Sequence, residues 1–430
     1  LPLYTRLLPP HEFGLVLVAL AAGGALSLVV APGIEAVYLR WVYREGRGSG
    51  PAAGTVTLLH LAMTAAALAV LAAAAAPLCS VLLPGLIVIN AVLVSLAAPL
   101  RAKWRAERRA DKVAGMEVAQ SLVSLVTVVT ALFVFRWGAV SLLAGETASG
   151  LLMLPFAVGR LVGNVRWGWD AALYRTVLPL AASGLPLTAS IWALSSLDRI
   201  LLNWISGPEA VALYGVAYQI GAAVMLVSVI LDKEWEVVVF DFAKPDTVTG
   251  GSAEALQGLW SLSLSLFMVL ASFVALFSNE IVRWGIGPQY AASARLIPWV
   301  VVVAVLKVPF SLMIHLARAR NHPEAVTIGS VLAVVVFVIG NLVLIPRWGP
   351  LGAVWAGIGG YASACLFWFS RQWNCFHMER GVTGRALVAG AAVLLGSLMG
   401  GTMVSRLAGS VIVGLLVYQA VSYWKFLGRI

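Results

Sequence analysis

The sequence has few charged residues. Only 11% of its 430 residues are Asp, Glu, Lys or Arg, whereas soluble proteins average about a quarter. Hydrophobic residues make up 61% of the chain, and the mean hydropathy is +0.93. So little polar material cannot cover the surface of a soluble domain of this length. The composition therefore excludes a soluble enzyme and indicates an integral membrane protein.

Motifs for cofactor or metal chemistry are also missing. The three cysteines, Cys79, Cys365 and Cys375, form neither a metal-binding pattern nor a disulfide framework. No G-x-x-x-x-G-K-[ST] loop is present, which argues against direct ATP hydrolysis. We therefore expect no cofactor, no metal and no catalytic residue.

Thirteen stretches are long and apolar enough to cross a membrane as helices, which takes about 20 residues each. They predict an all-α polytopic membrane protein with only short loops between its spans. The predicted spans are Phe13–Ile34, Thr55–Ala76, Leu82–Leu100, Val113–Phe135, Ala139–Val158, Val177–Ile205, Ala210–Leu231, Leu256–Phe277, Leu296–Ile314, Ala325–Ile345, Gly352–Ser370, Ala386–Val404 and Leu407–Trp424.

The basic residues predict the orientation of these spans, because short cytoplasmic loops retain Lys and Arg. Of the 29 basic residues, 21 lie in one set of alternate loops, seven lie in the other, and Lys307 lies inside a predicted span. This asymmetry places residues 1–12 outside and the C-terminus in the cytoplasm. It also accounts for the net charge of +10 without nucleic acid. Because the chain begins outside, we expect that a preceding helix is missing and that the native protein has fourteen spans.

Two pairs of similar segments suggest an internal duplication. Arg136-Trp137-Gly138 resembles Arg347-Trp348-Gly349, and the stretch after Arg6 resembles the stretch after Arg199. Both pairs are offset by six spans, so the two units have the same orientation in the membrane.

This duplication predicts two six-helix lobes around a central cavity, followed by two further helices. We expect an N-terminal lobe at 1–175, without its first helix, and a C-terminal lobe at 176–380. The two accessory helices lie within 381–430.

Three stretches resemble motifs of the Wzx-type polysaccharide flippase family, which belongs to the multidrug/oligosaccharidyl-lipid/polysaccharide (MOP) exporter superfamily. Arg6 to Gly14 resembles its R-L-L-S-P-E-E-F-G pattern, although Pro9 and His11 depart from it. Leu185-Pro186-Leu187 with Asp198-Arg199 resembles a seventh-helix pattern. Asn341 to Ala353 is similar to N-L-x-L-I-P-x-x-G-x-x-G-A.

The resemblance implies a fourteen-helix transporter in the bacterial cytoplasmic membrane whose cavity opens alternately to either side. Its implied cargo is an oligosaccharide on undecaprenyl pyrophosphate, such as an O-antigen or exopolysaccharide repeat unit. The expected partners are this lipid-linked cargo, membrane lipids, H⁺ or Na⁺ as a driving ion, and polysaccharide polymerase or assembly proteins.

Lys307 is the clearest charged residue inside a predicted span. A Lys at the bilayer centre costs roughly 2.5–3.5 kcal/mol on insertion scales, so such a residue is a candidate for function. Facing a wet cavity, it could bind a pyrophosphate or an acidic sugar. The alternative is a Lys that extends to the interface or pairs with a carboxylate.

Five further residues complete the candidate site. Arg199 and Arg6 are predicted to bind the anionic cargo, and Trp192 is predicted to stack on sugar rings. Asp198 and Glu146 are predicted to bind a coupling ion. The alternatives are an Asp198–Arg199 ion pair that fixes the helix end, a protonated packing role for Glu146, and core packing for Trp192.

Three classes of function compete for this sequence. The first is a flippase that moves a lipid-linked oligosaccharide to the outer leaflet, with lipid II as a close variant of the cargo. The second is a drug/cation antiporter, against which the positive charge of Lys307 argues. The third is a membrane enzyme such as an oligosaccharide polymerase. The longest outer segment, 278–295, has no paired carboxylates for that chemistry.

Overall fold

The computed structural model consists of helices throughout the part of the chain that it describes. The described residues are 1–30, 89–90, 93, 104, 109–163, 175, 185–242, 263–264, 266–319 and 323–372. Five helices within these ranges are long and apolar enough to cross a membrane, and up to seven if two bent pairs each count as one span. The predicted all-α polytopic fold is therefore confirmed. The predicted spans Thr55–Ala76, Ala386–Val404 and Leu407–Trp424 lie outside the described residues.

The chain divides into two compact units. The first contains Leu1–Gly14 and Leu201–Ile430, and the second contains Leu15–Ile200. The predicted lobes at 1–175 and 176–380 stay a prediction.

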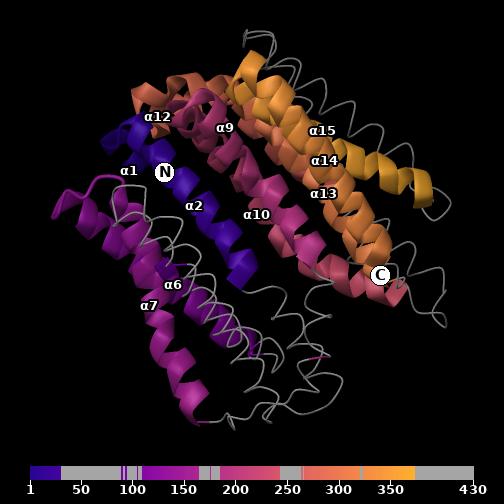
Figure 1. Ribbon diagram of the computed structural model, residues 1–430, viewed down its shortest axis with the longest axis horizontal. Coiled ribbons are helices and arrows are strands. Elements are labelled where there is room, and N and C mark those ends of the chain that lie inside the picture. Colours follow the sequence, from indigo (N-terminus) through magenta and orange to yellow (C-terminus); the bar gives the residue numbers. More distant parts are fainter. Residues whose placement is uncertain are drawn as a thin grey trace. The chain divides into compact units, whose positions relative to one another are not determined.

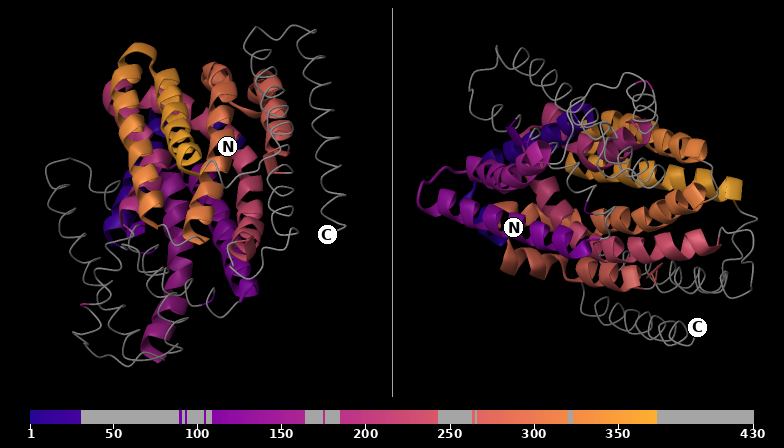
Figure 2. Two further views of the ribbon diagram at one scale, coloured as in Figure 1. Left: turned by 90° about the vertical axis from the view of Figure 1, so that its right-hand side faces the viewer. Right: turned by 90° about the horizontal axis from the view of Figure 1, so that it is seen from below.

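The described part of the first unit includes the helices α10, α12, α13, α14 and α15. Figure 1 shows three of them, α13, α14 and α15, side by side, and the views in Figure 2 agree. Helix α10 packs against α13 and α15. The bounds of these helices are α10 Pro208–Phe242, α12 Ser278–Gly285, α13 Ile297–Ala319, α14 Pro323–Trp348 and α15 Pro350–Gln372.

Small residues allow these helices to approach closely, as is common in membranes. A side chain on Gly221 of α10 would lie 2.7 Å from Val300 of α13. A side chain on Gly340 of α14 would lie 3.1 Å from Ala356 of α15. The helix contacts therefore depend on glycine at these two positions.

Two boundaries differ from the sequence prediction. Helix α10 extends to Phe242, although residues from Asp232 onward were expected in an inner loop. No Gly or Pro interrupts residues 222–242, so nothing stops the helix at the predicted end of the span. The expected loop 278–295 forms α12 and the 3-10 helix η3, Pro288–Arg295. These short helices are bent by 62° and 55° from the neighbouring apolar helices.

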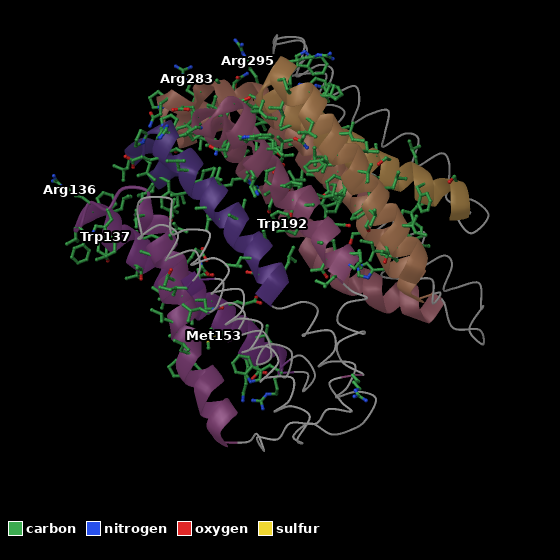
Figure 3. All side chains as sticks on the ribbon, viewed as in Figure 1. Arg136, Trp137, Met153, Trp192, Arg283 and Arg295 are labelled. Atoms are coloured by element: carbon green, nitrogen blue, oxygen red, sulfur yellow. The ribbon has the colours of Figure 1, made fainter. Side chains whose placement is uncertain are left out.

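In the second unit, α6 (Ala110–Phe133) and α7 (Val140–Gly163) form a hairpin. Figure 3 shows Arg136 and Trp137 projecting from the turn that joins them. Gly138 in this turn has φ 55°, and Gly349 between α14 and α15 has φ 54°. This left-handed conformation favours glycine. Both Arg-Trp-Gly segments thus supply the turn of a helical hairpin, as a duplicated unit would.

Residues Leu1–Gly14, which we call the N-terminal strap, are bound to the first unit by specific hydrogen bonds. The strap contains helix α1, Pro2–Leu7, and the start of helix α2, Pro10–Val30. The Arg6 guanidinium donates to the carbonyl oxygen of Trp284 at 2.7 Å. It thereby satisfies a carbonyl in the last turn of α12, where a cation is favourable.

The strap also binds the segment that follows α12. The side chain of Gln289 donates to the carbonyl oxygen of Thr5 at 2.6 Å, and the Tyr290 hydroxyl donates to that of Leu8 at 2.9 Å. The ring of Phe13 packs edge-on against Tyr290, with centroids 5.9 Å apart. Tyr290 is fully buried. These contacts fix the strap through its own backbone as well as its side chains.

The end of the strap contacts the start of α10. A ring nitrogen of His11 lies 2.9 Å from a carboxylate oxygen of Glu209, and both side chains are exposed. The backbone N–H of Glu209, followed by the His11 contact, holds the pKa of this carboxyl below its ordinary value. Gly14 packs directly on the carbonyl group of Pro208. The strap therefore spans from α12 to α10 within the first unit.

Replacing Gly287 with Ala should destabilise the protein. A Cβ atom there would overlap the Thr5 carbonyl group, so the strap would have to shift at a cost of about 1–3 kcal/mol. The measurement is the unfolding temperature in detergent. Gly285→Ala is the matched control, because a Cβ atom at Gly285 meets nothing within 4 Å. Equal unfolding temperatures for both variants would contradict the tight contact.

Candidate functional site

Lys307 lies near the middle of α13, which packs between α10 and α15. Its ammonium group donates a hydrogen bond to the Tyr218 hydroxyl at 2.8 Å. The sulfur of Met225, which lies on α10 together with Tyr218, is 3.6 Å from the ammonium nitrogen. The ammonium nitrogen is also 5.4 Å from the ring centroids of both Tyr218 and Tyr361. We call Lys307, Tyr218, Met225 and Tyr361 the lysine cage.

The cage stabilises a charge without neutralising it. The face of Tyr361 attracts the cation by about 0.5–2 kcal/mol, and the hydrogen bond from the ammonium group to the Tyr218 hydroxyl contributes about 1.5–3 kcal/mol. Within the described residues, no carboxylate forms an ion pair with Lys307. The pairing with a carboxylate that the sequence left open is therefore not seen there.

Further ring contacts hold the two tyrosines in place. The Tyr361 ring meets Phe310 edge-on at 5.4 Å, and the Tyr218 ring lies 5.8 Å from that of Tyr214. Tyr361 is 3% exposed and Tyr218 is 9% exposed, whereas Lys307 is half-buried. The two tyrosine rings are thus held in place, and Lys307 is more accessible than either of them.

Sequence reasoning found Lys307 but missed its partners. Tyr218 precedes Lys307 by 89 residues, and the partners lie on two other helices. A polar Tyr inside an apolar span was the only available signal, and it does not say which helix the side chain faces. The packing of α10, α13 and α15 assembles the cage.

Asp198 and Arg199 lie in the second unit, where a π-helical turn, η1 (Ala193–Leu197), leads into helix α9 (Asp198–Ser206). Asp198 is 1% exposed, and its carboxylate accepts the backbone N–H of Arg199 at 2.8 Å. The Arg199 guanidinium donates to the Ser195 carbonyl oxygen at 2.9 Å. Single π-turns are frequent at functional sites. Both residues here have contacts within their own helix, and their roles with cargo and ion stay predictions.

Trp192 packs against α2. Its indole N–H donates to the Ala21 carbonyl oxygen at 3.3 Å, and a Cβ atom on Gly24 would lie 2.9 Å from the same nitrogen. The half-buried indole thus has a packing role within the second unit. Its predicted stacking on sugar rings is untested.

The side chain of Glu146 is exposed, although its neighbours one turn away on α7, Leu143 and Gly150, are buried. Its neighbour Gly145 packs on α6 at Val128 and Ser124. The predicted ion-coupling role of Glu146 stays a prediction. Cargo binding by Arg6 also stays a prediction; the Arg6 guanidinium lies in the strap and donates a hydrogen bond to α12. Within the described ranges, no group of three or more His, Cys, Asp or Glu side chains is arranged to hold a metal ion.

A double-mutant cycle can measure the bond between Lys307 and Tyr218. Tyr218→Phe keeps the ring but removes the hydrogen-bond acceptor, so it should lower stability by about 1.5–3 kcal/mol, the usual contribution of a hydrogen bond to a charged group. The same change in a Lys307→Met background should cost much less. Unfolding of all four proteins in nanodiscs gives the coupling energy. If Tyr218→Phe lowered the free energy of unfolding equally with Lys307 and with Met at this position, the hydrogen bond between Lys307 and Tyr218 would contribute nothing to stability.

The fold resembles those of MOP superfamily transporters. The structure matches "Lipid II flippase MurJ, inward closed conformation" with a TM-score of 0.72 and 11% identity, covering 97% of this chain and 94% of that chain. It matches an inward-facing multidrug resistance MATE family transporter with a TM-score of 0.62 and 14% identity, covering 87% and 92%. A MOP superfamily transporter from Pyrococcus furiosus gives a TM-score of 0.53 at 14% identity, covering 88% and 86%. These identities establish a shared fold alone.

The sequence itself identifies the family. No curated protein sequence matches the chain. Residues 1–232, however, match the family described as "Polysaccharide biosynthesis protein". This match covers more than half of the chain and includes the strap and the Asp198–Arg199 turn. Together with the multi-pass helical fold, it shows that the chain is a membrane protein of the polysaccharide biosynthesis protein family.

Proposed function

We propose that this protein is a flippase for an undecaprenyl-pyrophosphate-linked oligosaccharide, an O-antigen or exopolysaccharide repeat unit. It moves the head group from the inner to the outer leaflet of the bacterial cytoplasmic membrane by alternating access, while the lipid tail stays in the bilayer. An ion gradient or the membrane potential drives the cycle. The C-terminus lies in the cytoplasm, and a polymerase or assembly protein receives the product.

The single observation that carries this proposal is the charge of the lysine cage. A site for cationic drugs needs net negative character, because a like charge repels the ligand. Lys307 instead presents a positive charge that neutral aromatic groups support. For the Pyrococcus furiosus transporter, reverse polarity of the binding pocket suggests a different function. By the same physical argument, the cage favours an anionic cargo over a cationic one.

Lipid II is the second candidate cargo. The likeness to the lipid II flippase extends over nearly the whole of both chains, and its TM-score is higher than those of the MATE transporter and the Pyrococcus furiosus transporter. Lipid II is also anionic, so the positive charge of Lys307 by itself does not separate the two cargoes. The polysaccharide biosynthesis family match favours the oligosaccharide.

An enzymatic role has less support. The segment 278–295 folds into α12 and η3, and Glu280 is its single carboxylate. Acid–base chemistry on a glycosidic bond usually takes two carboxyl groups. The structural relatives are transporters and a flippase. We therefore propose transport without catalysis.

Lys307→Ala should abolish flipping without preventing membrane insertion, because it removes the charge that attracts the cargo. The measurement is the exposure of lipid-linked oligosaccharide on the outer leaflet, read in cells with a sugar-binding probe that cannot cross the inner membrane. Cells without the protein should keep loaded carrier that is inaccessible from outside. Lys307→Arg, which retains the charge, should keep part of the activity.

Arg136→Gln is the matched control, since it also removes one positive charge but from an exposed turn. It should flip at the normal rate. Full activity of Lys307→Ala would remove this residue from the site. Unchanged leaflet exposure in cells without the protein would refute the flippase function. In that case, altered drug tolerance would point to an antiporter, and altered chain length to an enzyme.

A further inference from the structure

The lysine cage leaves little hydrogen-bonding capacity for a ligand. A Lys ammonium group has three N–H donors and no acceptor. In the structure, the Tyr218 hydroxyl accepts one donor at 2.8 Å, and the Met225 sulfur lies near the ammonium at 3.6 Å. The ring of Tyr361, with its centroid 5.4 Å from the nitrogen, lies on a further side of the ammonium group. About one strong donor therefore remains for a ligand oxygen.

The available charge is equally limited. Among the described Lys and Arg side chains of the first unit, Lys307 is the one in the middle of a long helix. The others lie at helix ends, and Figure 3 shows Arg283 and Arg295 pointing outward. A pyrophosphate carries more than one negative charge and several acceptor oxygens. Among these described side chains of the first unit, it would find one cationic partner for at least two negative charges, and an unpaired charge in a medium of low dielectric constant is costly.

The surroundings of the cage suit a sugar ring. The indole rings of Trp299 and Trp355 lie 4.5 Å apart on α13 and α15, the helices that also carry Lys307 and Tyr361. Both indoles are half-buried, and Trp299 lies about 12 Å from Lys307 along the helix at 1.5 Å per residue. Binding sites often combine aromatic walls with a few polar groups that fix the orientation of the ligand. Here the wall is aromatic, and the polar group is one ammonium.

From these observations we infer that the lysine cage binds the carboxylate of an acidic sugar, a uronic acid within the oligosaccharide head group. One carboxylate oxygen accepts the remaining N–H donor, and the single negative charge balances the single positive charge. The apolar face of the sugar lies against the aromatic wall formed by Trp299 and Trp355. The pyrophosphate of the carrier binds elsewhere. This inference rests on the proposed flippase function and narrows its cargo to acidic oligosaccharides.

The test is a binding measurement on the full chain in nanodiscs. The probes are a tetrasaccharide carrying one glucuronate, its methyl ester and inorganic pyrophosphate. Because a hydrogen bond between charged groups contributes about 1.5–3 kcal/mol, the acid should bind about tenfold or more tightly than the ester. Lys307→Gln should remove this preference, and Lys307→Arg should retain most of it. Pyrophosphate should not displace the acid.

Two results would overturn the inference: equal binding of acid and ester, or stronger competition by pyrophosphate than by the unlabelled acid. Unfolding curves of Lys307→Gln show whether that variant is folded. A second readout separates this inference from the proposed function. If carriers bearing neutral and acidic sugars are flipped equally well, the flippase function holds and the acidic-sugar inference fails. If neither carrier is flipped, the proposed function itself fails.

Discussion

The ammonium group of Lys307, placed inside a membrane helix, constrains the helices around it. Such a charge is costly in the bilayer unless nearby groups stabilise it. Within the described residues, a tyrosine hydroxyl, a methionine sulfur and the ring of Tyr361 stabilise this charge, and no carboxylate there forms an ion pair with it. Three helices, α10, α13 and α15, must therefore keep a fixed register, and glycine at Gly221 permits the approach of α10 to α13. A neutral support also leaves the charge available to an anion.

The N-terminal strap is the second feature on which the first unit depends. Its residues are far from the rest of the unit in sequence, yet its backbone accepts hydrogen bonds from Gln289 and Tyr290. The short helices α12 and η3 can bend away from the neighbouring apolar helices because the strap and their own ends satisfy their backbone groups. The contacts of the strap thus hold residues 278–295, which connect two apolar helices, in the defined structure of α12 and η3. Arg6 shows that a residue suggested as a cargo ligand already has a structural contact.

Fold and family inform the function at different levels. The likeness to a lipid II flippase and to a multidrug resistance MATE transporter establishes a common architecture, and these two proteins have different cargoes. The match over residues 1–232 establishes membership of a polysaccharide biosynthesis family. Neither identifies the cargo. The chemistry of the cage supplies that argument, because the charge and donor count of one side chain can be compared with those of each candidate head group.

The sequence by itself determined the membrane class, the helical fold and the position of Lys307 inside an apolar helix, because the length of an apolar run and a charge within it are local properties of the sequence. It also indicated the two Arg-Trp-Gly turns, which need glycine at φ near 55°. The extended end of α10 and the folding of residues 278–295 were missed, since hydropathy does not report helix formation beyond a span. Only the tertiary structure showed that Tyr218, Met225 and Tyr361 surround Lys307, that Trp192 contacts Ala21, and that residues 1–14 bind α12 and α10. Those contacts join segments tens to hundreds of residues apart, and only the packing of the helices decides which side chains meet.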